Sequence, residues 1–231
     1  MIKKEFQENY LGKDVYKYVI TGGIVAEISE FGATVLSLKA PASDGRLTDV
    51  ALGSADVQGM LGKTQYLGST VGRCCNRIAD GRFTLDGNEY RLYLNDGGIN
   101  SLHGGKLGFN ARLFGSVAEE KAGESSVTFS YVSPDGEEGY PAELDFSVKY
   151  TVKDRSLIIE YFATSDGDTL FSPTNHTFFN LNGENDGTIL DNVLKINAAG
   201  FLPINEKLIP TGNVRSVFNT PFDFTEYKEI G

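Results

Sequence analysis

A strict alternation of apolar and polar residues constrains the fold of this chain most. Its apolar positions are Leu144, Phe146, Val148, Tyr150 and Val152, and polar or small residues separate them. Because successive side chains of a strand point to opposite faces, this period of two predicts a strand with one buried and one solvent-facing side. Lys153-Asp154-Arg155 then predicts a tight reversal into a second strand over Ser156–Thr164.

Similar patterns recur along the chain. Further strands are predicted at Val15–Ile20, Ile24–Ser29, Thr34–Lys39, Val127–Val132 and Val193–Asn197. Asp86-Gly87 predicts a hairpin between Arg82–Leu85 and Tyr90–Leu94, because glycine accepts the positive φ that such turns require.

Helical signals are scarce. Only Ala55–Leu61, after Ser54 as the expected N-cap, predicts a short helix. Strands without intervening amphipathic helices favour antiparallel sheets packed face to face over a parallel α/β sheet. The chain shows no internal repeat, low-complexity tract or linker, which predicts a single all-β domain over residues 1–231.

Composition excludes several classes of function. The 21 Lys and Arg residues are outnumbered by 31 Asp and Glu, so a net charge of −10 disfavours nucleic acid as a partner. No apolar run approaches the ~18 residues of a membrane span, and the N-terminus lacks the apolar core of a signal peptide. Cys74 and Cys75 are adjacent and are interpreted as small packing residues in a reducing compartment, the cytoplasm.

Two histidines are the candidates for proton transfer near neutral pH. His103 lies in the predicted loop Asn95–Arg112 and is followed by two glycines, whereas His176 lies in the predicted loop Ser165–Glu184 among polar and aromatic residues. A hydrogen-bonded structural role is the competing interpretation for each. With no third ligand at a recognisable spacing, the sequence predicts no metal site.

The segment Gly72–Phe83 carries a cluster of candidate binding residues. Its arginines are Arg73, Arg77 and Arg82, and Asn76 precedes the second of them. Each arginine alone could be a solvated charge at a strand end. Arginine and asparagine side chains can also bridge neighbouring hydroxyl groups, so together with the histidines and aromatics they indicate a neutral sugar as ligand.

Five segments together resemble the aldose 1-epimerase (galactose mutarotase) family. They read, in chain order, GRCCNRIADGRF, NSLHGG, SPDGEEGYPAELDF, NHTFFNLNG and PTGNVRSVFNTPFDF. The similarity extends from about Gly32 to Phe224. The resemblance implies a large antiparallel β-sandwich, of the galactose mutarotase-like supersandwich type. It also implies interconversion of the α and β anomers of a free hexose, galactose or glucose, without a cofactor.

The resemblance also assigns site residues. His176 would be the general acid that protonates the ring oxygen, and His103 would hydrogen-bond the sugar near that oxygen or assist the acid. The remaining substrate-binding residues would be Asn76, Arg77, Thr177 and Phe178. The implied partner is a small aldose, with the protein a monomer or homodimer.

One departure from the family pattern concerns the general base. The family's sugar-binding aspartate and general-base glutamate lie C-terminal to the segment that ends at Phe224, so the C-terminal strands and the base are expected to be missing from residues 1–231. The other carboxylates singled out, Glu137, Glu138, Glu184 and Asp223, are expected to be solvated loop charges. Two alternatives stay open: a catalytically silent sugar-binding module, and a sugar-phosphate epimerase that would use Arg73 and Arg82.

Overall fold

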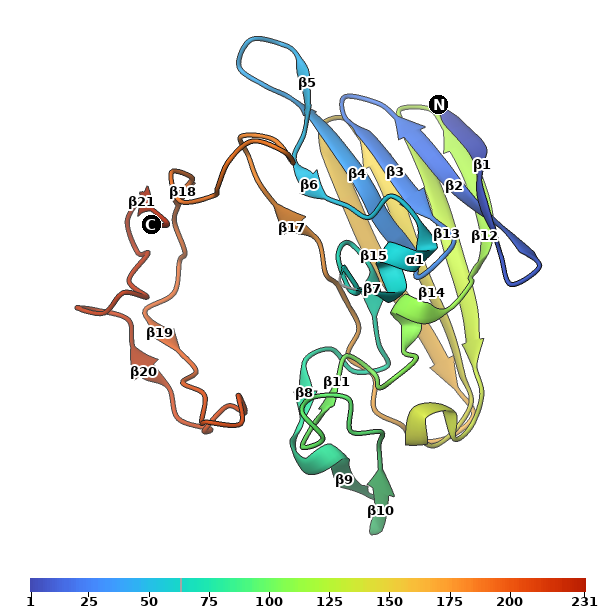
Figure 1. The fold of residues 1–231 in the computed structure, drawn as a ribbon, viewed down its shortest axis with the longest axis vertical. Coiled ribbons are helices and arrows are strands. Elements are labelled where there is room, and N and C mark those ends of the chain that lie inside the picture. Colours follow the sequence, from blue (N-terminus) through green and yellow to red (C-terminus); the bar gives the residue numbers. More distant parts are fainter. Residues whose placement is uncertain (63) are drawn as a thin grey trace.

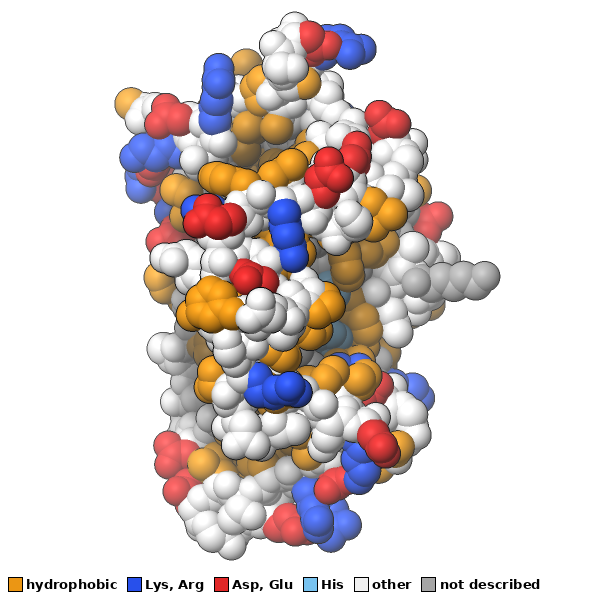
Figure 2. All heavy atoms as spheres, turned by 90° about the vertical axis from the view of Figure 1, so that its left-hand side faces the viewer, with side chains coloured by type: hydrophobic (Ala, Val, Ile, Leu, Met, Phe, Trp, Pro, Cys, Tyr) orange, Lys and Arg blue, Asp and Glu red, His pale blue; other side chains and the backbone are white. Residues whose placement is uncertain are grey.

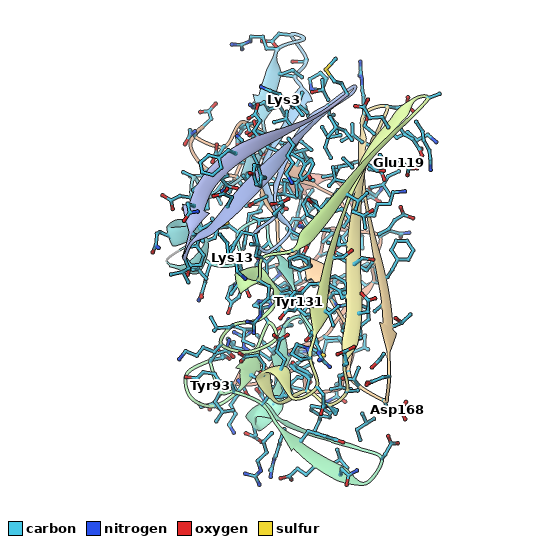
Figure 3. All side chains as sticks on the ribbon, turned by 90° about the vertical axis from the view of Figure 1, so that its right-hand side faces the viewer. Lys3, Lys13, Tyr93, Glu119, Tyr131 and Asp168 are labelled. Carbon is cyan, nitrogen blue, oxygen red and sulfur yellow. The ribbon has the colours of Figure 1, made fainter. Side chains whose placement is uncertain are left out.

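Two antiparallel sheets form the body of the molecule in a computed structural model that describes residues 1–62 and 64–231. The first has the order β1 (Ile2–Tyr10), β2 (Lys13–Thr21), β3 (Val25–Ser29), β4 (Thr34–Pro41), β5 (Leu47–Asp49). The second has the order β12 (Gly115–Lys121), β13 (Glu124–Ser133), β14 (Leu144–Lys153), β15 (Ser156–Ser165). Figure 3 shows the two sheets from the side with a layer of side chains between them, which confirms the predicted antiparallel β-sandwich.

Short ladders and turns connect and extend the sheets. The ladders pair β6 (Ala51–Leu52) with β17 (Phe178–Phe179), β7 (Thr70–Val71) with β16 (Thr174–Asn175), β8 (Arg77–Ile78) with β11 (Ser101–Leu102), β9 (Arg82–Leu85) with β10 (Asn88–Arg91), β18 (Val193–Leu194) with β21 (Lys228–Glu229), and β19 (Gly200–Phe201) with β20 (Arg215–Ser216). The helical pieces are α1 (Val57–Leu61) and the 3₁₀ turns Ala79–Gly81, Phe109–Ala111 and Glu137–Gly139. Among the described residues, no helix is both long and apolar enough to cross a membrane.

The alternating segment behaves as predicted. The apolar positions of β14 are buried, and β14 pairs with β15 from Leu144↔Ser165 to Lys153↔Ser156. Phe146 is fully buried, and its ring stacks on Phe109 with the ring centroids 4.7 Å apart. The core between the sheets therefore depends on the period of two that the sequence displays.

Several predicted boundaries were wrong. Helix α1 begins at Val57, and its N-cap is Asp56, whose carboxylate accepts a hydrogen bond from Gly59 N–H at 2.7 Å. Ser54 instead hydrogen-bonds Thr64 Oγ1 at 3.1 Å, so its hydroxyl is engaged elsewhere. Strand β18 stops at Leu194, short of the predicted Asn197.

The predicted hairpin forms, with a shifted second strand. Asp86 and Gly87 both have positive φ, 51° and 79°, which suits a two-residue turn. Leu85 then pairs with Asn88, so β10 covers Asn88–Arg91 rather than the predicted Tyr90–Leu94. Strands β1 and β12, which were not predicted from the sequence, are each an edge strand of one of the two sheets.

Phe146→Ala should lower the free energy of unfolding by about 3–5 kcal/mol, because a buried ring leaves a cavity in a tightly packed core. Phe162 on β15 is 53% exposed, so the same substitution there should cost less than about 1 kcal/mol. Urea unfolding of both variants measures the difference. Equal losses would contradict the assignment of the core.

Candidate active site

The fold brings the two histidines together. His103 follows β11 and His176 follows β16, and their ring centroids lie 4.9 Å apart with the ring planes at 83°. Figure 2 shows histidine side chains recessed in a hollow of the molecular face, surrounded by hydrophobic groups. The two long loops predicted from the sequence therefore converge on one site, although each contains short strands of its own.

His176 is positioned by backbone pairing at the end of the β7–β16 ladder. Its N–H donates to Ser69 O at 2.9 Å, and its carbonyl accepts from Gly68 N–H at 3.1 Å. The Thr177 hydroxyl donates to Asn175 Oδ1 at 2.5 Å, so this predicted binding residue uses its proton within the protein. Phe178 is 49% exposed, and its ring lies 5.1 Å from the His176 ring, centroid to centroid.

His103 and Asn76 hold each other in place. Asn76 N–H donates to His103 Nδ1 at 3.1 Å, while His103 N–H donates to Asn76 O at 3.0 Å. Both residues have positive φ, 53° for His103 and 57° for Asn76. Because Nδ1 accepts this hydrogen bond, the proton of the neutral imidazole resides on Nε2. His103 can therefore offer an Nε2–H donor to a ligand.

Arg77 lies beside these residues and is held by a carboxylate. Its Nε donates to Asp96 Oδ2 at 2.7 Å, and its Nη1 donates to Asn76 Oδ1 at 3.3 Å. Asn100 Nδ2 donates to the same Asp96 oxygen at 3.1 Å. The hydrogen bonds from Arg77 and Asn100 lower the pKa of Asp96, so its carboxylate stays ionised and orients the guanidinium.

Tyr66 is a site residue that the sequence did not reveal. Its ring centroid lies 4.7 Å from that of His103 and 6.1 Å from that of His176. Its hydroxyl accepts from Asn95 Nδ2 at 3.4 Å, and its φ is 76°, unusual for a bulky residue. No local motif distinguishes Tyr66 from the other tyrosines of the chain; its place follows from the tertiary fold.

The two arginines considered as phosphate ligands differ in burial. Arg73 is only 2% exposed and donates to carbonyl and hydroxyl oxygens of Ser133, Pro134, Pro141 and Thr169 at 2.8–3.1 Å. The N–H donors of Arg73 are therefore hydrogen-bonded within the protein, so Arg73 is not available to bind a phosphate group. Arg82 is exposed on β9 and lies 4.0 Å from the Glu89 carboxylate.

The expectation of solvated loop charges was also wrong for two of the carboxylates. The Glu137 carboxylate accepts from Tyr131 Oη at 2.6 Å and from Ser133 Oγ at 2.5 Å, and pairs with Arg112 Nη2 at 2.8 Å. The Glu138 carboxylate accepts from backbone N–H groups of the loop that carries His103. The sequence motif that contains both residues gave no hint of these partners.

Ligands for a metal are not gathered in the described part of the chain. Residues 1–62 and 64–231 contain no group of three or more His, Cys, Asp and Glu side chains that could hold an ion. Cys74 is buried, and burial raises the pKa of its thiol to about 11. At neutral pH Cys74 is thus a protonated packing residue rather than a nucleophile.

The environment of His103 keeps its imidazole neutral. Burial, and then the nearby His176 and Arg77, lower the pKa of His103 from the ordinary 6.5 to about 4, although Asp96 opposes them. A histidine with this pKa carries almost no proton to donate as an acid at neutral pH. His103 is therefore suited to donate a hydrogen bond to a ligand rather than to transfer a proton.

We expect His103 to titrate near pH 4 by NMR. Since its folded pKa lies below the unfolded value, the unfolded state binds more protons between about pH 4 and 6.5, so the free energy of unfolding should fall as pH decreases through that window. His103→Asn should remove this contribution, because asparagine tolerates positive φ and does not titrate. Urea unfolding at several pH values checks it, and a His103 pKa of 6.5 would contradict it.

Comparison with known proteins identifies the family. A family model described as aldose 1-epimerase matches residues 16–231. Galactose mutarotase from Bos taurus is 44% identical over 205 residues, which cover 89% of this chain and 58% of that protein. Aldose 1-epimerase from Escherichia coli is 37% identical over 209 residues, covering 90% and 59%. The chain thus spans less than two thirds of the length of these relatives.

Solved structures agree with the sequence relatives. The galactose 1-epimerase of Lactobacillus acidophilus superposes with a TM-score of 0.87 at 28% identity, over 100% of this chain and 67% of that one. An aldose epimerase homologue from C. elegans gives 0.82 at 33% identity, over 93% and 66%. The two-sheet sandwich, the motif segments around the paired histidines and a family match over almost the whole sequence lead to one conclusion: the chain belongs to the aldose 1-epimerase family.

Proposed function

We propose that the protein interconverts the α and β anomers of a free hexose, such as galactose or glucose. The observation that carries the proposal is the pair of imidazoles 4.9 Å apart, with Asn76 and Arg77 held beside them. Support comes from relatives named galactose mutarotase and aldose 1-epimerase.

Ring opening would need two proton transfers. A carboxylate takes the proton of the anomeric hydroxyl while His176 donates a proton to the ring oxygen, and the bond between the anomeric carbon and the ring oxygen breaks to give the open-chain aldehyde. Rotation of the aldehyde end and closure from its other face invert the anomeric centre. Ring closure reverses the two proton transfers of ring opening. Because opening and closure need only proton transfer, the proposal requires no cofactor.

His103, Asn76 and Arg77 would bind the sugar. The Nε2–H of neutral His103 donates to a sugar oxygen near the reacting bond, and the remaining donors of Arg77 and Asn76 reach neighbouring hydroxyls. The rings of Tyr66 and Phe178 border the histidines and would contact the apolar faces of the sugar ring. Thr177 contributes mainly by fixing the Asn175 side chain next to His176.

We assign the general base to none of the carboxylates around this site. Asp96 is bonded to Arg77 and Asn100, Glu137 to Tyr131, Ser133 and Arg112, and Glu138 to backbone N–H groups. These carboxylates are acceptors already engaged in holding the scaffold. The sugar-phosphate alternative loses its main support because Arg73 is buried and its N–H donors are hydrogen-bonded within the protein.

A cytoplasmic location and a role in carbohydrate metabolism belong to the same proposal. Cys74 and Cys75 are unpaired thiols, as is usual in a reducing compartment. A single domain, and a monomeric or homodimeric state, stay predictions.

The test is polarimetry of freshly dissolved α-galactose and α-glucose, with and without the protein. Because the carboxylates around the site are engaged in holding the scaffold, residues 1–231 should accelerate mutarotation only weakly, and His176→Asn should remove that acceleration, since a positioned general acid usually contributes roughly 10²–10⁴-fold. Phe162→Ala, at an exposed site on β15, serves as control and should leave the rate unchanged. Sugar binding without acceleration would favour the silent binding module and contradict the proposal.

A further inference from the structure

The segment Ser133–Pro141 is a family motif that the proposed chemistry does not use. It connects β13 to β14 through a 3₁₀ turn at Glu137–Gly139. The segment contacts two of the parts of the chain that carry site residues, the loop after β11 and the stretch Gly72–Arg77.

Glu138 fixes the first of these parts. Its Oε2 accepts from Lys106 N–H at 2.7 Å and its Oε1 from Leu107 N–H at 3.2 Å. The two N–H groups follow directly after His103-Gly104-Gly105, and a carboxylate acceptor forms stronger hydrogen bonds than a neutral one. Glu138 adopts φ 52°, an uncommon conformation for a residue with a Cβ.

The loop held by Glu138 packs closely against its neighbours at two glycines. Gly105 has φ 110°, and a Cβ there would collide with the Glu138 carboxylate. Gly104 has φ 92°, and a Cβ there would collide with the carbonyl of Gly72. The backbone next to His103 is thus enclosed between Glu138 and Gly72.

Arg73 fixes the second part. Four of its hydrogen bonds go to the segment: to Ser133 Oγ and O, at 3.0 Å each, to Pro134 O at 2.9 Å and to Pro141 O at 2.8 Å. Arg73 precedes Asn76 and Arg77 in the same stretch of chain. The carboxylate of Glu137, bonded to Tyr131, Ser133 and Arg112, anchors the segment to β13 and to the loop before β12.

We propose that Ser133–Pro141 is a brace for the active site, and that Glu138 is a positioning residue that sets the place of His103 relative to Asn76. Glu138 does not touch the sugar; it acts through the loop Gly104–Leu107. The inference rests on the proposed function for its effect on turnover, but the position of His103 can be measured without substrate.

The test compares Glu138→Gln with Glu143→Gln in the full chain. Glutamine has the size of glutamate but lacks its charge, and its amide offers only one acceptor oxygen for the two N–H donors. Glu143 is an exposed neighbour whose side chain has no hydrogen bond or ion pair among the described residues, so it is a matched control. Histidine NMR signals are followed against pH, and kcat and KM are measured by polarimetry.

Glu138→Gln should raise the His103 pKa toward 6.5, because a released loop exposes the ring to water and weakens its bond to Asn76 N–H. The groups that face His103 are His176, Arg77, Asp96 and Tyr66, and they are the same in every variant. Loss of a nearby negative charge alone would lower a histidine pKa, so a rise identifies repositioning. We expect kcat/KM to fall about tenfold or more, and Glu143→Gln to behave as wild type.

An unchanged His103 titration in a folded Glu138→Gln protein would overturn the inference. If that variant does not fold, amide hydrogen exchange of the unaltered protein decides: Lys106 and Leu107 N–H groups should be protected, and exchange at the rate of free peptide would refute the brace. Neither measurement uses sugar. A protein without mutarotase activity would therefore refute the proposed function while leaving the brace to be tested separately.

Discussion

The buried guanidinium of Arg73 is the interaction on which the arrangement of the site depends. A charged group taken out of water must find full hydrogen bonding, or the fold loses several kcal/mol, on the order of the net stability of a domain. Arg73 obtains that bonding mainly from backbone carbonyls around Ser133–Pro141. These carbonyl oxygens all point at the Arg73 guanidinium only when the turn there has one conformation. The hydrogen bonds to Arg73 therefore also order the turn that carries Glu137 and Glu138.

The sandwich was readable from the sequence because its information is local. The alternation in Leu144–Val152 and the Asp86-Gly87 turn each specify geometry within a few residues, and both appear in the structure. The helix cap was misjudged because Ser54 and Asp56 are both good caps, and the choice depends on Thr64, which engages Ser54. Strands β1 and β12 were missed because they flank the sheets, where exposed positions weaken the alternation.

The site was predictable where residue chemistry and family motifs point to the same residues. The motifs indicated the histidines, Asn76 and Arg77, and the fold brings these residues together. Tyr66, Asp96 and the partners of Arg73 come from distant parts of the chain, and no spacing rule links them. The same lack of long-range information explains why Arg73, Glu137 and Glu138 looked like solvated charges: sequence gives the charge of a residue but not its burial.

The two histidines are held by the backbone in different ways. His176 ends a short ladder, and its main chain is bonded on both sides to Ser69 and Gly68. His103 sits in a left-handed conformation with Nδ1 committed to the Asn76 amide, and its burial favours the uncharged ring. An imidazole with one nitrogen occupied and a depressed pKa can orient a ligand but is a poor proton carrier. The loop that holds His103, 4.9 Å from His176, thereby sets both the tautomer and the charge of the His103 imidazole.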